Sequence, residues 1–122
     1  MSRHNDYMAL IRQLRENVPD ITGVMIASVD GLAIATDFPE SEAARIAAMG
    51  ASSIGLGTRI SDTTDLGKLT QMMIEGKNEL LVIYMAGPGA ILALRAPIRA
   101  NLGLIRLEGP KAAHKAAELI LA

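Results

Sequence analysis

The segment from Ser41 to Asp62 constrains the fold most, because it carries very little charge. No charged residue stands between Arg45 and Arg59, and alanine, glycine and serine fill much of the interval. A surface helix normally keeps a wide polar face toward water, whereas a helix that is apolar or small nearly all round is covered on both sides. One small domain can cover one side of such a helix. We therefore expect the other side to meet a second protein.

The ends and the glycines of this segment fit a packed helix. Ser41 is expected to cap it, with Glu42 near the positive end of the helix dipole. Three glycines stand in its interior, and each costs about 0.8–1 kcal/mol of helix stability relative to alanine; they are Gly50, Gly55 and Gly57. That the helix tolerates this cost indicates that another backbone approaches it closely.

Composition bounds the class of protein. The 122 residues predict a single domain over residues 1–122, and half of them are hydrophobic, which is typical of a globular chain. The net charge of −1 argues against nucleic acid as the main partner. Aromatic residues are only 2% of the chain, so the stacking platforms of single-strand binding sites are missing.

The sequence lacks cysteine, a secretory signal and a spanning segment, and these absences bear on the expected compartment and on membrane insertion. Without cysteine there is no disulfide framework and no thiolate metal site. The stretch Met1–Leu14 is amphipathic and charged, unlike a secretory signal. The uncharged stretch Leu80–Leu94 is shorter than the roughly 20 residues of a spanning helix, and Gly87-Pro88-Gly89 interrupts it. We expect a cytoplasmic protein without membrane insertion.

Hydrophobic periodicity predicts the order helix, two strands, helix, three strands, helix. The strands near the start should be joined by a two-residue hairpin turn at Asp30-Gly31. The third strand mixes polar and apolar residues, as expected at a sheet edge. The expected elements are a helix over Asp6–Asn17, strands over Ile21–Val29 and Leu32–Thr36, the helix described above, strands over Lys68–Glu75, Leu80–Met85 and Ala90–Ala96, and a helix from Asn101 to the C-terminus.

Gly109-Pro110 lies inside the last predicted helix. Proline removes one helical hydrogen bond and clashes with the preceding turn, so a kink or break is expected there. Alternatively, Pro110 could be the first residue of a new helix.

Three stretches together resemble the Roadblock family, the dynein-light-chain-like domains. They are Gly23–Ala35, which contains the first hairpin, Ala47-Ala-Met-Gly-Ala-Ser52, and Asn101–Glu108, which opens the last helix. The resemblance implies an α+β fold with a five-stranded antiparallel sheet in the order 2-1-5-4-3. It places the first and last helices on one face and the long middle helix on the other.

The resemblance also implies a homodimer in which third strands pair edge to edge and middle helices pack together. The expected interface residues are Ala47, Ala51 and Ile54 in the helix, with Thr70 and Met72 in the strand. Family members serve as platforms for Ras-like small GTPases, and the bacterial gliding-motility regulator accelerates GTP hydrolysis by its partner. The hypothetical GTPase contacts are Arg45, Met49 and Ser52. This predicts a non-enzymatic protein without a cofactor.

The sequence gives less support for a metal site, a nucleotide site or a catalytic arginine than for a platform. His4 and His114 have no second histidine at metal-ligand spacing. The short glycine runs do not continue as a nucleotide-binding motif. Arg45 or Arg59 could act on a partner's phosphates, but an arginine on a packed helix has little freedom to reach them. Two other functions stay open: a sensing module with a small molecule between sheet and helix, and a purely structural dimer.

Overall fold

A computed structural model describes residues 3–121 of the chain. Within that range it contains three helices and five strands, in the order expected from the sequence. The helices are α1 (Arg3–Asn17), α2 (Glu40–Thr63) and α3 (Leu102–Leu121); the strands are β1 (Gly23–Ser28), β2 (Ala33–Thr36), β3 (Gln71–Glu75), β4 (Glu79–Met85) and β5 (Ala90–Pro97).

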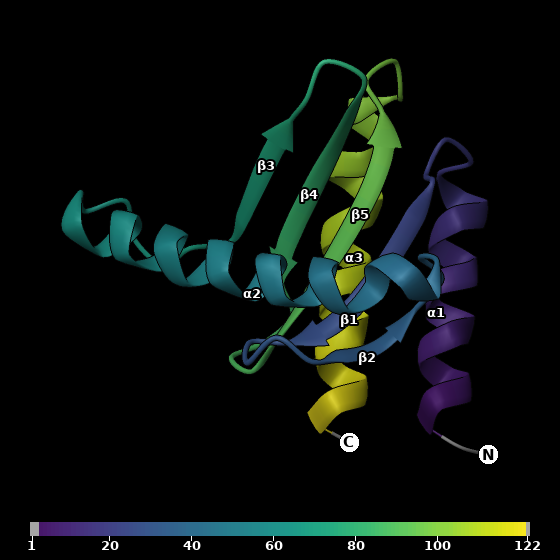
Figure 1. The fold of residues 1–122 in the computed structure, drawn as a ribbon, viewed down its shortest axis with the longest axis horizontal. Helices are drawn as coiled ribbons and strands as arrows, with labels where there is room; N and C mark the ends of the chain where they lie inside the picture. The colour runs from purple at the N-terminus through teal and green to yellow at the C-terminus, as the bar shows by residue number, and fades with distance from the viewer. Residues whose placement is uncertain (1–2, 122) are drawn as a thin grey trace.

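The strands form one antiparallel sheet in the order β2-β1-β5-β4-β3. Helices α1 and α3 lie on one face of this sheet, and α2 crosses the other face (Figure 1). The predicted α+β fold, including its strand order and the placement of the helices, is confirmed. Strands β2 and β3 are the two edges.

Each face of the sheet carries its own hydrophobic core, because neighbouring residues of a strand point to opposite faces. In β1, Val24 and Ile26 pack toward α1 and α3, whereas Met25 and Ala27 pack toward α2. The same alternation continues in β5, whose residues are buried on both sides. This double coverage explains why the central strands show no polar face in the sequence.

The first hairpin differs from the predicted two-residue turn. The Ser28 N–H donates to the Leu32 carbonyl at 2.9 Å, and the Gly31 N–H donates to the Ser28 carbonyl at 3.0 Å. The loop therefore has three residues, and only Gly31 has positive φ, at 94°. Three-residue hairpin loops with a left-handed third residue are a common alternative to the two-residue turn.

Helix α2 begins slightly earlier than expected and without the predicted serine cap. Pro39 occupies the N-cap position with no side-chain hydrogen bond, and Ser41 lies inside the first turn. Glu40 and Glu42 both stand in that turn, where negative charge favours the helix dipole. The start of α2 thus has two carboxylates in its first turn and a proline with a restricted backbone at the N-cap, in place of the predicted Ser41 hydroxyl.

Helix α3 runs without interruption through Pro110, so the predicted break and the alternative of a second helix are both wrong. Pro110 is exposed and lines a hollow that also contains Tyr84 and Met85 of β4. Gly109 is buried, and a Cβ there would overlap the Tyr84 ring of β4. The Gly-Pro pair therefore allows close packing of a continuous helix on the sheet.

Tyr84 is the polar side chain of β4 on which Gly109 of α3 packs. Its hydroxyl donates to the Ile105 carbonyl of α3 at 3.4 Å. Burial raises the pKa of Tyr84 to about 12, against an opposing effect of the Arg106 charge.

At the start of α3, the Leu104 N–H donates to Asn101 Oδ1 at 3.0 Å, so Asn101 caps this helix.

The C-terminal part of α2 extends past β3, beyond the edge of its own sheet (Figure 1). We call this part of the helix, residues 55–63, the overhang. Strand β3 is shorter than predicted and begins at Gln71, because residues 64–70 form the connection that returns from the overhang. Within the overhang only Gly57 and Ser61 are buried, and the other seven residues are exposed.

Candidate partner-binding surface

Helix α2 carries two parallel stripes of residues at alternating spacings of three and four, which place each stripe on one face. The inward stripe packs on the sheet and comprises Ala47, Gly50, Ile54, Gly57 and Ser61, all buried. The outer stripe comprises Arg45, Met49, Ser52, Leu56 and Arg59, all exposed. The two stripes are offset by two residues, about 200° around the helix, so they lie on opposite sides.

Two residues predicted to form a dimer interface belong to the inward stripe. Ala47 is 0% exposed and Ile54 is 4% exposed within this single chain. Both pack in the core on the α2 side of the sheet, which leaves their side chains little surface for a second copy, and their place in an interface stays a prediction. Ala47, Ala51 and Ile54 were predicted to share one face by their spacing, and they lie toward the chain's own sheet and first hairpin.

The small residues of α2 serve the fold of the chain itself. A Cβ at Gly57 would overlap the Met72 sulfur of β3 and lie 3.1 Å from Leu69. Ala51 is half-buried and faces Gly31 of the first hairpin. The close approach expected at the glycines is therefore found at Gly50 and Gly57, where side chains of the same chain lie close, but not at Gly55, which has no neighbour within 4 Å.

The three predicted GTPase contacts, Arg45, Met49 and Ser52, lie together on the outer stripe. Met49 is 63% exposed, and Leu56, one stripe position beyond Ser52, is 53% exposed. The centre of the stripe is therefore apolar or small, and it faces away from the core. Sequence reasoning missed Leu56, although its spacing of seven from Met49 places both on one face.

Two arginines flank this apolar centre. Their positions are separated by about 21 Å along the helix axis. Arg45 donates to the carbonyl of Ser41 in its own helix, at 3.5 Å. Within residues 3–121, neither Arg45 nor Arg59 makes an ion pair. The outer stripe thus presents apolar side chains between two cations that no carboxylate of the described residues neutralises.

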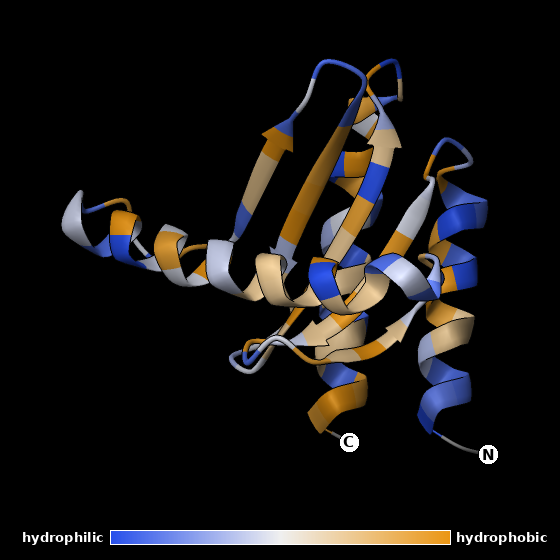
Figure 2. Ribbon diagram, in the orientation of Figure 1, coloured by the Kyte–Doolittle hydropathy of each residue, from blue (hydrophilic) through white to orange (hydrophobic). Residues whose placement is uncertain are grey.

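A second apolar area lies on the overhang and β3. Leu56, Ile60, Leu66 and Ile74 are large and exposed, and along the overhang hydrophobic bands alternate with polar and intermediate ones (Figure 2). Thr70, a predicted interface residue, is exposed beside them, whereas Met72 is half-buried beneath α2. The overhang and the strand below it therefore expose apolar surface together.

Strand β3 also presents unpaired backbone groups, because it pairs only with β4 among the described strands. The Met85 N–H donates to the Thr70 carbonyl at 3.0 Å, so Thr70 and every second residue after it point toward β4. The backbone groups of Gln71, Met73 and Glu75 consequently point outward. An open edge of this kind is a template for another strand.

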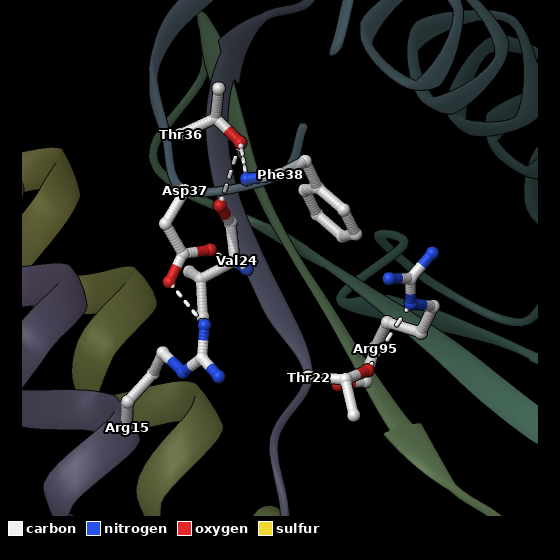
Figure 3. Close-up of polar contacts among 7 residues, drawn as sticks. All are labelled: Arg15, Thr22, Val24, Thr36, Asp37, Phe38 and Arg95. Carbon is white, nitrogen blue, oxygen red and sulfur yellow. Dashed lines mark hydrogen bonds and ion pairs between the residues drawn. The ribbon is translucent and has the colours of Figure 1, made fainter. Parts of the chain in front are cut away.

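The start of α2 is held to the sheet by polar contacts at the corner after β2 (Figure 3). Asp37 accepts from the Val24 N–H at 2.8 Å and pairs with Arg15 of α1 at 2.5 Å. On the other face of the sheet, the Arg95 guanidinium lies over the Phe38 ring, 4.9 Å from its centroid. These contacts fix the direction in which α2 leaves the sheet.

Two hollows adjoin α2. A shallow one of about 320 Å³ lies on the outer side between Glu42, Arg45, Ile46 and Met49. A groove of about 760 Å³ runs beside the overhang toward the first hairpin and the β4–β5 turn. Its lining includes Val29, Ile54, Thr58, Leu69 and Pro88, with Asp62 and Lys68 as its charged residues.

Over the described part of the chain, no three potential metal ligands of the His, Cys, Asp or Glu type lie together. His114 stands 3.8 Å from Glu118 on the exposed side of α3. No helix among residues 3–121 is long and apolar enough to cross a membrane.

Comparison with known proteins gives consistent matches. The family model described as Roadblock/LC7 domain matches residues 8–96. An uncharacterised protein of Methanocaldococcus jannaschii, MJ1340, is 38% identical over 96 residues, which cover 78% of this chain and 83% of that protein.

Solved structures share the fold. The Roadblock/LC7 domain from Streptomyces avermitilis superposes with a TM-score of 0.88 at 24% identity, covering 93% of this chain and 97% of that one. The gliding protein MglB from Thermus thermophilus superposes with a TM-score of 0.87 at 14% identity, covering 98% of this chain and 91% of that one.

Proposed function

Because the chain belongs to the Roadblock/LC7 family, we propose that it is a non-enzymatic homodimeric platform that binds and regulates a Ras-like small GTPase in the cytoplasm. The resemblance to that family supplies the class of partner. The surface of α2 supplies the place where the partner would bind.

The outer stripe is the observation that carries this proposal. Met49 and Leu56 expose apolar surface in the middle of a well-packed helix, between Arg45 and Arg59. Folding of the single chain does not explain these side chains, because the inward stripe already packs α2 on the sheet. Large exposed apolar side chains flanked by charged ones are typical of a protein-binding site.

Dimerisation is proposed through the overhang and the free edge of β3. If β3 pairs with β3 of a second copy about a twofold axis, each overhang would lie above the sheet of the other protomer. Ile60 and Ile74 would then be covered, and the backbone groups of β3 would be paired. Such an interface should bury about 1,200–2,000 Å² or more.

A pair of charge substitutions tests the location of the GTPase site. Met49→Glu places a carboxylate at the centre of the outer stripe, whereas Leu107→Glu introduces the same charge at a similarly exposed leucine of α3. Binding to a Ras-like GTPase from the same organism is measured by biolayer interferometry. We expect Met49→Glu to weaken binding at least tenfold and Leu107→Glu to leave it within about twofold, since interface centres lose several kcal/mol on such changes. Equal effects of the two variants would contradict this location.

The groove beside the overhang favours a second candidate function, a small-molecule sensing module. Its volume of about 760 Å³ lies within the range of small-molecule pockets. Native mass spectrometry of the purified protein tests this candidate. A bound mass that is lost in a Thr58→Trp variant, which fills the groove, would support sensing in place of the platform.

A further inference from the structure

We propose that Arg95 is a positioning residue of the partner-binding surface: by pairing with Glu42, it leaves the Arg45 guanidinium available for a carboxylate on the partner. This inference rests on the proposed function, since it concerns how the same surface recognises its GTPase. It assigns a role to a residue of β5 that lies on the sheet side of α2 and not on the outer stripe.

The local spacing on α2 creates a competition for Arg45. Glu42 and Arg45 are three residues apart, so their side chains are neighbours on the helix surface and could pair with each other. Both residues line the shallow hollow that also contains Met49. A Glu42–Arg45 pair would neutralise the cation at this end of the outer stripe.

The structure shows a different arrangement. Glu42 Oε1 lies 3.5 Å from Arg95 Nη1, and no ion pair between Glu42 and Arg45 is present within residues 3–121. Arg45 instead donates weakly to the Ser41 carbonyl at 3.5 Å. Arg95 therefore draws the nearest carboxylate toward the sheet and away from Arg45.

Arg95 is held in place by contacts on several sides. Its Nε donates to Thr22 Oγ1 at 3.2 Å and lies 3.5 Å from Glu79 Oε1. The guanidinium also rests over the Phe38 ring (Figure 3). A planar guanidinium that stacks and donates in several directions has a defined orientation, which a lysine would not reproduce. Arg95 can thus bind Glu42 from a fixed position below α2.

Removing the Arg95 charge should therefore affect a partner that Arg95 does not touch. In Arg95→Gln, Glu42 loses its cation and can turn to Arg45. A carboxylate on the partner must then compete with Glu42 for the same guanidinium. Because an ion pair at an exposed site is weak, we expect affinity for the GTPase to fall about two- to fivefold.

A double-mutant cycle tests this role. The variants are Arg95→Gln, Glu42→Gln and both together, with Arg99→Gln as the control, since Arg99 pairs with Asp20 and is far more exposed than Arg95. Affinity for the GTPase is measured by isothermal titration calorimetry at low and high salt. We expect weakening in Arg95→Gln only, recovery in the double variant to the level of Glu42→Gln, and loss of the difference at high salt.

Two results would overturn the role of Arg95. One is unchanged binding in Arg95→Gln. The other is a double variant as weak as Arg95→Gln, which would mean that Arg95 acts by holding α2 in place. If no GTPase binds the wild-type protein, the proposed function is refuted and the role of Arg95 needs a test of its own. For this test, the Arg45 Nε–Hε resonance is followed by NMR without any partner. It should shift in Arg95→Gln and return in the double variant; an unmoved resonance contradicts the inference by itself.

Discussion

At the residue scale, Gly109 and Pro110 are adjacent in α3 but lie in opposite environments. Gly109 is buried against the Tyr84 ring, whereas Pro110 is exposed. Their substitutions should therefore change stability in opposite directions. The sequence alone predicts the same sign for both, because each residue disfavours a helix.

Gly109→Ala is expected to lower the free energy of unfolding by about 1–3 kcal/mol, since its methyl group would overlap the Tyr84 ring. Pro110→Ala is expected to raise it by about 1 kcal/mol or more, because a backbone donor is restored at an exposed position. Urea unfolding of each variant measures both values. A stabilised Gly109→Ala would show that α3 can move away from β4 at no cost.

Tyr84 predicts a pH dependence of stability. Its pKa in the folded protein is about 12 and its ordinary value is 10.0, so the unfolded chain releases this proton at lower pH than the folded chain. The contribution to stability is complete below about pH 10 and is lost as the pH rises toward about 12. Urea unfolding between about pH 9 and pH 11 should thus show a steeper decline for the wild type than for Tyr84→Phe. Parallel declines would contradict the burial of this hydroxyl.

At the element scale, the order of helices and strands could be predicted because periodicity distinguishes strands from helices. Which face of α2 packs on the sheet could not be predicted from the sequence. Its segment is apolar or small nearly all round, so hydropathy gives little preference between the face with Ala47 and Ile54 and the face with Met49 and Leu56. Only contacts with Ile91, Met72 and the first hairpin decide which face is buried, and these lie far away in sequence.

Truncation of one residue from each stripe tests this orientation. Ile54→Ala should destabilise the monomer by about 2–5 kcal/mol, because it opens a cavity in the core on the α2 side. Leu56→Ala should change monomer stability by no more than about 0.5 kcal/mol, because its side chain is exposed. Thermal unfolding at a concentration low enough to suppress self-association compares the two. Similar losses would mean that α2 is rotated about its axis relative to this structure.

At the scale of the whole molecule, the overhang and the open β3 edge predict a specific oligomer. Sedimentation equilibrium of the wild type should give the mass of a dimer. Ile60→Glu combined with Ile74→Glu should give a folded monomer, because two charges per protomer would be buried in the proposed contact. Leu107→Glu, on the opposite layer of the molecule, serves as the control and should stay dimeric. A dimer that survives the double substitution would exclude the overhang from the interface.

The candidate site could be predicted only in part at this scale. Arg45, Met49 and Ser52 were predicted to share a surface, and they do lie together on the outer stripe. The role proposed for Arg95 has no signal in the sequence, because Arg95 and Glu42 come from elements separated by β3 and β4. Sheet topology alone brings this arginine beneath the start of α2.

The most direct test of the proposed platform is isothermal titration calorimetry of the wild-type protein with each Ras-like GTPase of the same organism. Each GTPase is loaded in turn with GDP and with a non-hydrolysable GTP analogue. We expect at least one GTPase to bind, with an affinity that differs at least tenfold between the two nucleotide states, because a regulator must distinguish them. Absence of binding by every GTPase in both nucleotide states would contradict the proposed function.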